Sequence, residues 1–360
     1  MKILLVTPLY PPEIGGPATY ARFLEKEIPK HDSSIKIVKF SDVRKYPPII
    51  RHILLLCKVL RHGISADIVF AQDAFSVALP AILAAKILRK PFVVRIPGDF
   101  AWEQGRQRFG VKDDILTFQN KKYGWKVEFY RKVQKWVVQN ADRVLAPSDF
   151  FAKLVSGWMN NKKAIAIYNG IDFDLLKNIK VDNKDNIFSI ISSGRMVNWK
   201  GFSSLIEIIS RNKSWKLFLV GDGPEKDNLK RLRDEKDLKD SVFFLGKLSQ
   251  DDLWKKIKES DVFVLNSSFE SFSFQVVEAM ALGTPVIATT GCNLEEIIEN
   301  NKNGFLVPVN DLVALENILR QLSNDKELKE KIGQSGNIRA QDFSIKKTVS
   351  RLLEIFKEII

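Results

Sequence analysis

A strand, a helix and a second strand in the last third of the chain constrain its fold more than any other stretch. Two short apolar segments, residues 261–265 and 285–288, have the composition of buried parallel strands. Between them we expect a helix, because Ser271 or Ser273 can cap its start and Gly283 suits the left-handed residue just past its end. Strands and helices that alternate in this way predict a parallel α/β sheet.

Two glutamates lie at the edge of this predicted sheet. Glu270 falls in the loop that leaves the carboxyl end of the first strand, and Glu278 falls inside the helix. Open α/β sheets bind ligands at that edge, and the free N–H groups at the start of a helix favour a phosphate. Because two carboxylates would repel an anion, we interpret them as acceptors for ligand hydroxyls, which together with a phosphate indicates a nucleotide sugar. Alternatively, both glutamates are solvated on an amphipathic helix.

Two cations follow another predicted strand, residues 188–192. Arg195 and Lys200 lie in the loop beyond this strand and next to the start of a helix at Phe202. A guanidinium fork and an ammonium point charge can clamp a diphosphate. The pair is therefore a candidate phosphate site.

Strands and helices alternate along the whole chain. At 360 residues the chain exceeds the size at which a single core usually splits, so we expect two domains. Turn residues at 168–172 and the polar stretch 177–186 mark a hinge. We predict the α/β fold class with two Rossmann-like doubly wound domains, residues 1–170 and 187–344. The expected strands are residues 2–7, 35–40, 68–71, 92–96, 141–148, 188–192, 216–220, 242–245, 261–265, 285–288 and 303–307.

These motifs, taken together and in this order, resemble the retaining GT-B fold glycosyltransferases of family 4, also called group 1. The R-x4-K motif of Arg195 and Lys200 precedes the E-x7-E motif of Glu270 and Glu278 by the expected interval, and a glycine pair follows the first strand. The resemblance covers nearly the whole chain. It implies two domains that face each other across a cleft, and a C-terminal helix, residues 345–360, that packs back on the first domain.

The resemblance also implies roles for single residues. The first domain would bind the acceptor and the second the nucleoside-diphosphate sugar, with Glu278 on the donor ribose and Glu270 on the hydroxyls of the transferred sugar. Ser271 and Ser273 stand where the family usually has glycines, so the backbone N–H groups are retained. The residues expected to contact the donor are Gly15, Gly16, Arg195, Lys200, Gly221, Leu245, Glu270, Ser271, Phe272, Ser273, Phe274 and Glu278.

A retaining transfer is the implied reaction. Arg195 and Lys200 would neutralise charge on the departing nucleoside diphosphate, and a donor phosphate oxygen would take the proton of the acceptor. We expect no metal and no other cofactor. Asp172 and Asp174 form an Asp-x-Asp of the type that holds a metal in the other large glycosyltransferase fold, but they lie in the predicted hinge.

The loop after the fourth strand departs from the family pattern. Many family members carry a histidine there, close to the transferring sugar, whereas this chain has Gly98 and its three histidines lie elsewhere. Asp99 is the nearest candidate for a catalytic role towards the acceptor or the sugar. The alternative is an aspartate that caps the next helix.

All the excess positive charge lies in the first half of the chain. Residues 1–180 contain 30 Lys and Arg against 16 Asp and Glu, whereas the remainder contains 26 against 27. Because no nucleic-acid-binding motif is present, an anionic substrate or an anionic membrane surface is the expected partner. We therefore expect a glycan or lipid-linked acceptor, a cytoplasmic location and peripheral contact with the inner face of the membrane.

Two predicted helices of the first half leave alternatives open. Over residues 46–62, an apolar stripe that includes Ile49 and Ile53 fits either a membrane-surface helix or an ordinary helix that covers a sheet. Over residues 119–140, aromatic and cationic side chains interleave, which fits rings that stack on bases, a lipid interface, or a core face beside a solvated face.

The amino terminus, the apolar runs and the cysteines indicate the cellular compartment of the protein. The amino terminus reads as a strand and not as a signal peptide, and no apolar run is long enough to span a bilayer. Cys57 and Cys292 lack metal-ligand spacing and suggest buried thiols in a reducing compartment.

The predicted function is the transfer of a sugar from a nucleoside-diphosphate sugar to a hydroxyl of a glycan or lipid-linked acceptor, in the synthesis of cell-surface polysaccharide or glycolipid. Two rivals remain open. A nucleotide-sugar epimerase of the same fold would need its own general acids and bases, which the scarcity of histidine disfavours. A non-catalytic nucleotide-sugar-binding protein would bind the donor without turnover.

Overall fold

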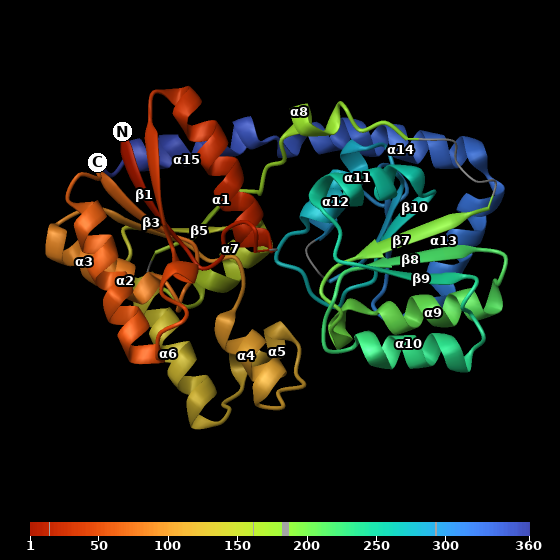
Figure 1. Cartoon of the computed structure of the whole chain (residues 1–360), viewed down its shortest axis with the longest axis horizontal. Coiled ribbons are helices and arrows are strands. Elements are labelled where there is room, and N and C mark those ends of the chain that lie inside the picture. Colours follow the sequence, from red (N-terminus) through yellow and green to blue (C-terminus); the bar gives the residue numbers. More distant parts are fainter. Residues whose placement is uncertain (14, 161, 182–186, 292–293) are drawn as a thin grey trace. The chain divides into compact units, whose positions relative to one another are not determined.

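The chain folds into two compact units, each built on one parallel sheet (Figure 1). The computed structural model describes residues 1–13, 15–160, 162–181, 187–291 and 294–360. Unit 1 comprises Met1–Gly170 and Ile345–Ile360, and unit 2 comprises Ile171–Ser344. The helix at the carboxyl end of the chain thus belongs to the first unit, where it packs beside the first helix.

The sheet of unit 1 has the strand order β2-β1-β3-β4-β5-β6, and every pair is parallel. Its central strands are buried along their whole length, as expected for a parallel sheet that helices cover on both faces. The strands are β1 (Lys2–Thr7), β2 (Ser34–Lys39), β3 (Ile68–Ala71), β4 (Phe92–Arg95), β5 (Arg143–Ala146) and β6 (Ile165–Ala166).

The helices of unit 1 follow from the direction in which the chain steps across this sheet. From β2 to β3, β4 and β5 it always steps the same way, so right-handed crossovers place α2, α3 and α6 on one face. The step from β1 to β2 is opposite, which places α1 on the other face. The helices are α1 (Gly16–Glu27), α2 (Pro48–Gly63), α3 (Ala78–Leu88), α4 (Phe100–Arg108), α5 (Ile115–Asn120), α6 (Trp125–Asn140), α7 (Asp149–Ser156) and α15 (Ile345–Lys357).

The sheet of unit 2 has the order β12-β11-β10-β7-β8-β9, again with parallel pairs throughout. An apolar core packs between its helices and the inner strands. The strands are β7 (Ser189–Ser193), β8 (Lys216–Val220), β9 (Val242–Gly246), β10 (Val262–Leu265), β11 (Val286–Thr289) and β12 (Phe305–Val307). The helices are α8 (Phe173–Leu176), α9 (Phe202–Arg211), α10 (Lys226–Glu235), α11 (Gln250–Glu259), α12 (Phe274–Ala281), α13 (Leu312–Asn324) and α14 (Lys326–Ala340).

The predicted α/β class with two doubly wound sheets is confirmed, and several local expectations are corrected. Residues 119–140 are not one helix, because α5 ends at Asn120 and α6 begins only after Gly124. Cys57 is exposed and not buried, while Cys292 lies outside the described residues. In α2 the predicted apolar stripe faces outward at Ile49 and Ile53. Among the helices described, none is both long and apolar enough to cross a bilayer.

Candidate functional site

The strand order of unit 2 reverses between two neighbouring strands, β7 and β10. From β7 the chain steps outward to β8 and β9, and it then returns to the other side of β7 to form β10. The crevice beyond the carboxyl ends of two such strands is where open α/β sheets bind ligands. The loops that leave β7 and β10 are therefore the expected ligand-binding loops of unit 2.

The two loops meet through an ion pair. Lys200 ends a short 3-10 turn, Asn198–Lys200, after β7, and its Nζ donates to Oε1 of Glu270 in the loop after β10. The two side chains are only 14% and 13% exposed. The structure thus brings together the lysine of the predicted R-x4-K motif and the first glutamate of the E-x7-E motif. Arg195, in the same loop as Lys200, has an exposed side chain.

Glycines allow the strand-end loops to pack this closely. A Cβ on Gly201 would overlap the backbone oxygen of Asn266, and a Cβ on Gly221 would overlap that of Gly194. Both glycines also have positive φ, 62° and 133°, which side chains disfavour. The aliphatic end of Lys200 passes over Gly194, where an added Cβ would lie 3.7 Å from Nζ. Small residues here leave the ammonium group next to the backbone.

The helix that follows Glu270 begins and ends as the sequence predicts. The hydroxyl of Ser273 caps α12 by accepting from Val276 N–H at 3.3 Å, and Gly283 follows the helix with φ 74°. Ser273 and Phe272 are buried, whereas Ser271 and Phe274 are half-buried. The rings of Phe272 and Phe274 meet edge to face with centroids 5.8 Å apart. These contacts hold the loop that carries Glu270.

The second glutamate of the motif is fully buried. Glu278 is 1% exposed, and its Oε1 accepts a 2.8 Å hydrogen bond from Nε2 of Gln250 at the start of α11. Burial raises the pKa of Glu278 to about 7, although the side chains of Trp254 and Gln250 act in the opposite direction. The carboxyl group is therefore poised between its acid and its anion at neutral pH.

Two further predicted positions lie at the same edge of the sheet. Gly221 N–H donates to the backbone oxygen of Gly246 at 2.7 Å. The register between β8 and β9 shifts there, since Leu219 pairs with Phe244 and Val220 pairs with Gly246. Leu245 is the extra residue of this bulge. A bulge re-aims the backbone next to a site, in keeping with the backbone contacts predicted at Leu245.

In unit 1, the predicted glycine pair lies after β1. Gly15 precedes α1 with φ 152°, and Gly16 is the first residue of the helix, with Pro17 in its first turn. Leu9 lies against Gly15, where an added Cβ would lie 3.0 Å from Cδ1. Because β1 lies between β2 and β3, this loop also leaves the sheet where the strand order reverses.

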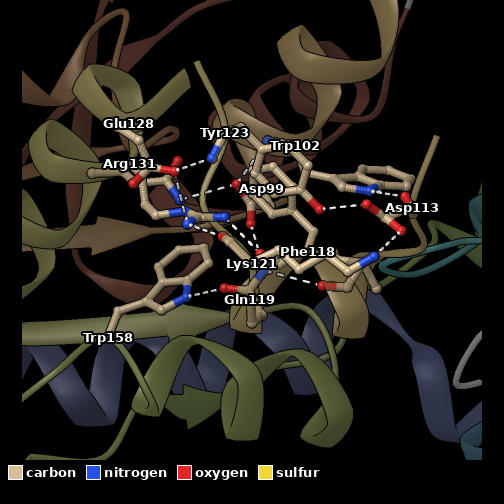
Figure 2. Close-up of polar contacts among 12 residues, drawn as sticks. Asp99, Trp102, Asp113, Phe118, Gln119, Lys121, Tyr123, Glu128, Arg131 and Trp158 are labelled. Carbon is tan, nitrogen blue, oxygen red and sulfur yellow. Dashed lines mark hydrogen bonds and ion pairs between the residues drawn. The ribbon is translucent and has the colours of Figure 1, made fainter. Parts of the chain in front are cut away.

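Asp99 lies in a polar network and caps a helix (Figure 2). Its carboxylate is 0% exposed and accepts from the N–H of Trp102 at 3.1 Å and from the side-chain amides of Gln134 and Gln119, each at 2.9 Å. Gln119 accepts in turn from the indole N–H of Trp158 at 2.8 Å. Burial raises the pKa of Asp99. The structure therefore favours the capping alternative, and a catalytic role for Asp99 stays a prediction.

The rest of this network joins α5 to α6. Arg131 of α6 donates to the backbone oxygens of Phe118 at 2.6 Å and Lys121 at 2.8 Å, and it pairs with Glu128. The sequence pattern did not predict the break between the two helices, and one buried guanidinium holds the two helix ends together there. Its signal in the sequence is Gly124, which interrupts an otherwise helical pattern.

Two site residues of unit 2 carry no signal in the sequence. Gln250 is the partner of Glu278, and Asn266 donates from Nδ2 to the backbone oxygen of Gly201 at 3.1 Å. Neither lies in a predicted motif, because both are defined by the packing of one loop against another. In the parts of the chain that the structure describes, no three His, Cys, Asp or Glu residues gather as metal ligands would.

Family models match both halves of the chain. The model for Glycosyltransferase Family 4 matches residues 6–175, and the model for Glycosyl transferases group 1 matches residues 174–339, which contain the Lys200–Glu270 pair. The chain belongs to the family 4, group 1 glycosyltransferases. The two models meet close to the boundary between unit 1 and unit 2.

Relatives agree with this assignment. The lipopolysaccharide core biosynthesis glycosyltransferase LpsE of Rhizobium meliloti is 30% identical over 202 residues, which cover 55% of this chain and 59% of LpsE. An uncharacterized glycosyltransferase of Methanocaldococcus jannaschii is 25% identical and aligns over 100% of this chain and 99% of its own. A crystal structure of HepE from Anabaena in complex with UDP and glucose has a TM-score of 0.78 at 20% identity and covers 99% of this chain and 100% of that chain. The fold is GT-B.

Proposed function

We propose that this glycosyltransferase moves a hexose, with retention of configuration, from a nucleoside-diphosphate sugar to a hydroxyl of a glycan or lipid-linked acceptor. The observation that carries the proposal is the partly buried Lys200–Glu270 pair where the strand order of unit 2 reverses. A cation next to the backbone and a carboxylate beside it are the two groups that a sugar diphosphate needs, one for the phosphates and one for the hydroxyls.

In the proposed reaction the two motifs divide the donor between them. Lys200 and the exposed Arg195 bind the diphosphate and neutralise the charge that grows on it as the sugar departs. Glu270 accepts hydrogen bonds from the hydroxyls of the transferred sugar, and Glu278 from the ribose. The acceptor hydroxyl gives its proton to a donor phosphate oxygen, so the reaction needs neither a metal nor a triad.

Two relatives support the substrate classes. HepE has been crystallised with UDP and with UDP-glucose, which supports a UDP-hexose as the first donor to test. LpsE is named for lipopolysaccharide core biosynthesis, which supports an acceptor in cell-surface glycan or glycolipid synthesis. The excess of cations in the first half of the chain suits an anionic acceptor bound by unit 1. We place the protein in the cytoplasm, at the inner face of the membrane.

The proposal can be tested by donor binding and donor breakdown in one experiment. Wild type, Arg195→Ala and a control, Lys247→Ala, are screened by thermal shift against UDP-, GDP- and ADP-sugars, and release of nucleoside diphosphate is followed in the same wells. Lys247 is a matched control because it is an exposed cation in the loop after β9, at the same edge of the sheet. A true donor stabilises the folded state by mass action.

We expect one donor to raise the melting temperature of wild type and Lys247→Ala, to lose its effect on Arg195→Ala, and to be slowly broken down. Release should persist in the presence of a chelator, because the proposed reaction uses no metal. If no nucleotide sugar shifts wild type, the donor site is misassigned. If a donor binds but no nucleoside diphosphate is released even with acceptor extracts, the proposed transfer is wrong.

A further inference from the structure

Large apolar side chains that face solvent are concentrated in unit 1. Of the sixteen exposed large hydrophobic residues in the described part of the chain, thirteen belong to unit 1 and three, Ile187, Val313 and Ile338, to unit 2. Scattered apolar residues on a surface are normal, but a group of them on one side of a protein marks an interaction site. The group on unit 1 lies mainly on three neighbouring helices, α2, α3 and α6.

Helix α2 turns an apolar stripe away from the protein. Leu55 and Val59 are fully buried and hold the helix on the sheet. On the opposite side, Ile49 is 77% exposed and Ile53 is 55% exposed, and Tyr46 and Ile50 next to them are also exposed. The helix therefore has two apolar sides, and only one of them packs against unit 1.

Helix α6 shows the same arrangement with aromatic residues. Trp125, Phe129 and Trp136 are 77%, 52% and 38% exposed, and they recur at spacings of four and seven residues, which keeps them on one side of the helix. The exposed Lys132 lies between them on that side. Tryptophan among lysines is typical of side chains that lie at the headgroup level of a bilayer.

Helix α3 joins the two stripes. It packs between α2 and α6, and all three helices cover the same face of the sheet (Figure 1). Its own outward side chains are Leu83, Ile87 and Lys86. Lys86 reaches α6, where its Nζ donates to Asn140 at 2.8 Å and lies 5.1 Å from the centre of the Trp136 ring. We call this surface the α2–α3–α6 face, made of Tyr46, Ile49, Ile50, Ile53, Leu83, Ile87, Trp125, Phe129 and Trp136.

The charge on these helices indicates what covers the face. Together α2, α3 and α6 carry eight Lys and Arg and a single acid, Glu128. Arg131 is buried in its pair with Glu128, and Lys58 pairs with Asp42, so six other cations remain on these helices. Two copies of such a face would repel each other, which disfavours self-association. A nucleic acid would satisfy the cations but would leave the isoleucines in water. An anionic lipid surface satisfies both, because phosphates meet the cations while apolar side chains enter the acyl boundary.

We propose that the α2–α3–α6 face is a membrane-docking surface that lays unit 1 on an anionic bilayer. The isoleucines of α2 and the aromatic residues of α6 enter the interface, and the lysines among them bind lipid phosphates. This inference rests on the surface of unit 1 and not on the proposed transfer, so either can fail without the other.

Vesicle flotation of the full chain tests the docking surface. Vesicles of pure phosphatidylcholine are compared with vesicles of equal parts phosphatidylcholine and phosphatidylglycerol, for wild type, for Ile49→Ser/Ile53→Ser and for Trp125→Ala/Phe129→Ala. The matched control is Val313→Ser/Ile338→Ser, which removes two side chains of unit 2 that are 65% and 73% exposed. Thermal melting of every variant, compared with that of wild type, shows whether the substitutions leave the chain folded.

Wild type and the unit 2 control should float with the anionic vesicles and not with pure phosphatidylcholine, and added salt should weaken the binding. Each α2 or α6 variant should lower the bound fraction about tenfold, since two apolar side chains leave the interface. The proposal is overturned if wild type does not bind anionic vesicles, or if both double variants bind as well as wild type. It is also overturned if light scattering shows a dimer that the variants abolish, because the face then pairs with a second copy.

Discussion

Lys200 and Glu270 neutralise each other at the edge of the unit 2 sheet, so a donor that binds there must give each of them a new partner. The diphosphate replaces the carboxylate beside Lys200, and the sugar hydroxyls replace the ammonium beside Glu270. Neither charge is left unpaired when the pair separates, which limits the desolvation cost of binding. Removal of either residue would therefore leave the other without its partner before the donor binds.

Lys200→Ala and Glu270→Gln should each lower the rate of donor-dependent nucleoside diphosphate release about 10²-fold or more, because each removes a preorganised charge or acceptor from the transition state. Lys247→Ala should leave the rate little changed. The measurement is the initial rate of release at saturating donor, with thermal melting as the check on folding. Equal rates for Lys200→Ala and Lys247→Ala would place the phosphates elsewhere.

Glu278 predicts a pH dependence of stability. Its pKa is raised from 4.5 to about 7 by burial, so between these values the folded state holds a proton that the unfolded chain has lost. The free energy of unfolding therefore falls as the pH rises from about 4.5 to 7 and then levels off. A shift of this size corresponds to about 3 kcal/mol.

Glu278→Gln keeps the oxygen that accepts from Gln250 and removes the titration. Relative to wild type, the variant should gain stability as the pH rises from about 4.5 to 7, and the difference should level off above pH 7. Urea unfolding of both proteins at several pH values measures the difference, in which all other titrating groups cancel. Parallel curves for the two proteins would mean that Glu278 has an ordinary pKa.

At the scale of single elements, the loops at the sheet edge of unit 2 depend on where a Cβ can fit. Gly221 and Gly246 both have positive φ, but an added Cβ at Gly221 overlaps the backbone oxygen of Gly194, whereas at Gly246 it meets open space. Gly246→Ala should therefore cost about 1–2 kcal/mol of stability, the penalty of the backbone conformation alone. Gly221→Ala should cost more and should also abolish donor-dependent stabilisation, since the loop next to Lys200 must move. Donor thermal shifts of the two variants decide the point, and equal losses would contradict it.

Helix α4 offers a test of the role of Asp99. If Asp99 is a cap, Asp99→Ala removes an N-cap and leaves the amides of Gln119 and Gln134 without their acceptor, which should cost about 2–4 kcal/mol. Asp114→Ala, which removes the exposed N-cap of α5, should cost about 1 kcal/mol. Denaturant unfolding measures both losses. If Asp99→Ala keeps its stability but loses sugar transfer, Asp99 acts on the substrate and not on the helix.

The same elements show how far sequence reasoning reaches. The cap at Ser273 and the stop at Gly283 were predictable, because local backbone chemistry decides them. The apolar pattern also located α2, but periodicity alone cannot say which of two apolar sides packs against the sheet, and Ile49 lies on the outer one. Likewise, the motif located Glu278 but not its burial or its partner Gln250, since α11 and α12 meet only in three dimensions.

At the scale of the whole molecule, the two units differ in charge and in surface. The first half of the chain carries the excess of Lys and Arg, and unit 1 carries most of the exposed large apolar side chains among the described residues, while unit 2 holds the Lys200–Glu270 pair. Anchoring and donor binding are thus assigned to different units. A nucleotide sugar should therefore leave the exposed helices of unit 1 unchanged, and a membrane should leave the loops after β7 and β10 of unit 2 unchanged.

Hydrogen exchange of the full chain tests this division. A nucleotide sugar should slow amide hydrogen exchange in residues 194–201 and 270–278 of unit 2. The bound phosphates and hydroxyls stabilise those loops against local opening. The nucleotide sugar should leave α2 and α6 of unit 1 unprotected.

Anionic vesicles should have the opposite effect. They should slow exchange at the ends of α2 and α6 without changing the loops after β7 and β10. Mass spectrometry of peptides from both units, with each ligand alone and with both together, gives the pattern. If the nucleotide sugar protects only unit 1, the donor site lies in unit 1, because Lys200 and Glu270 both belong to unit 2 and could not account for the binding.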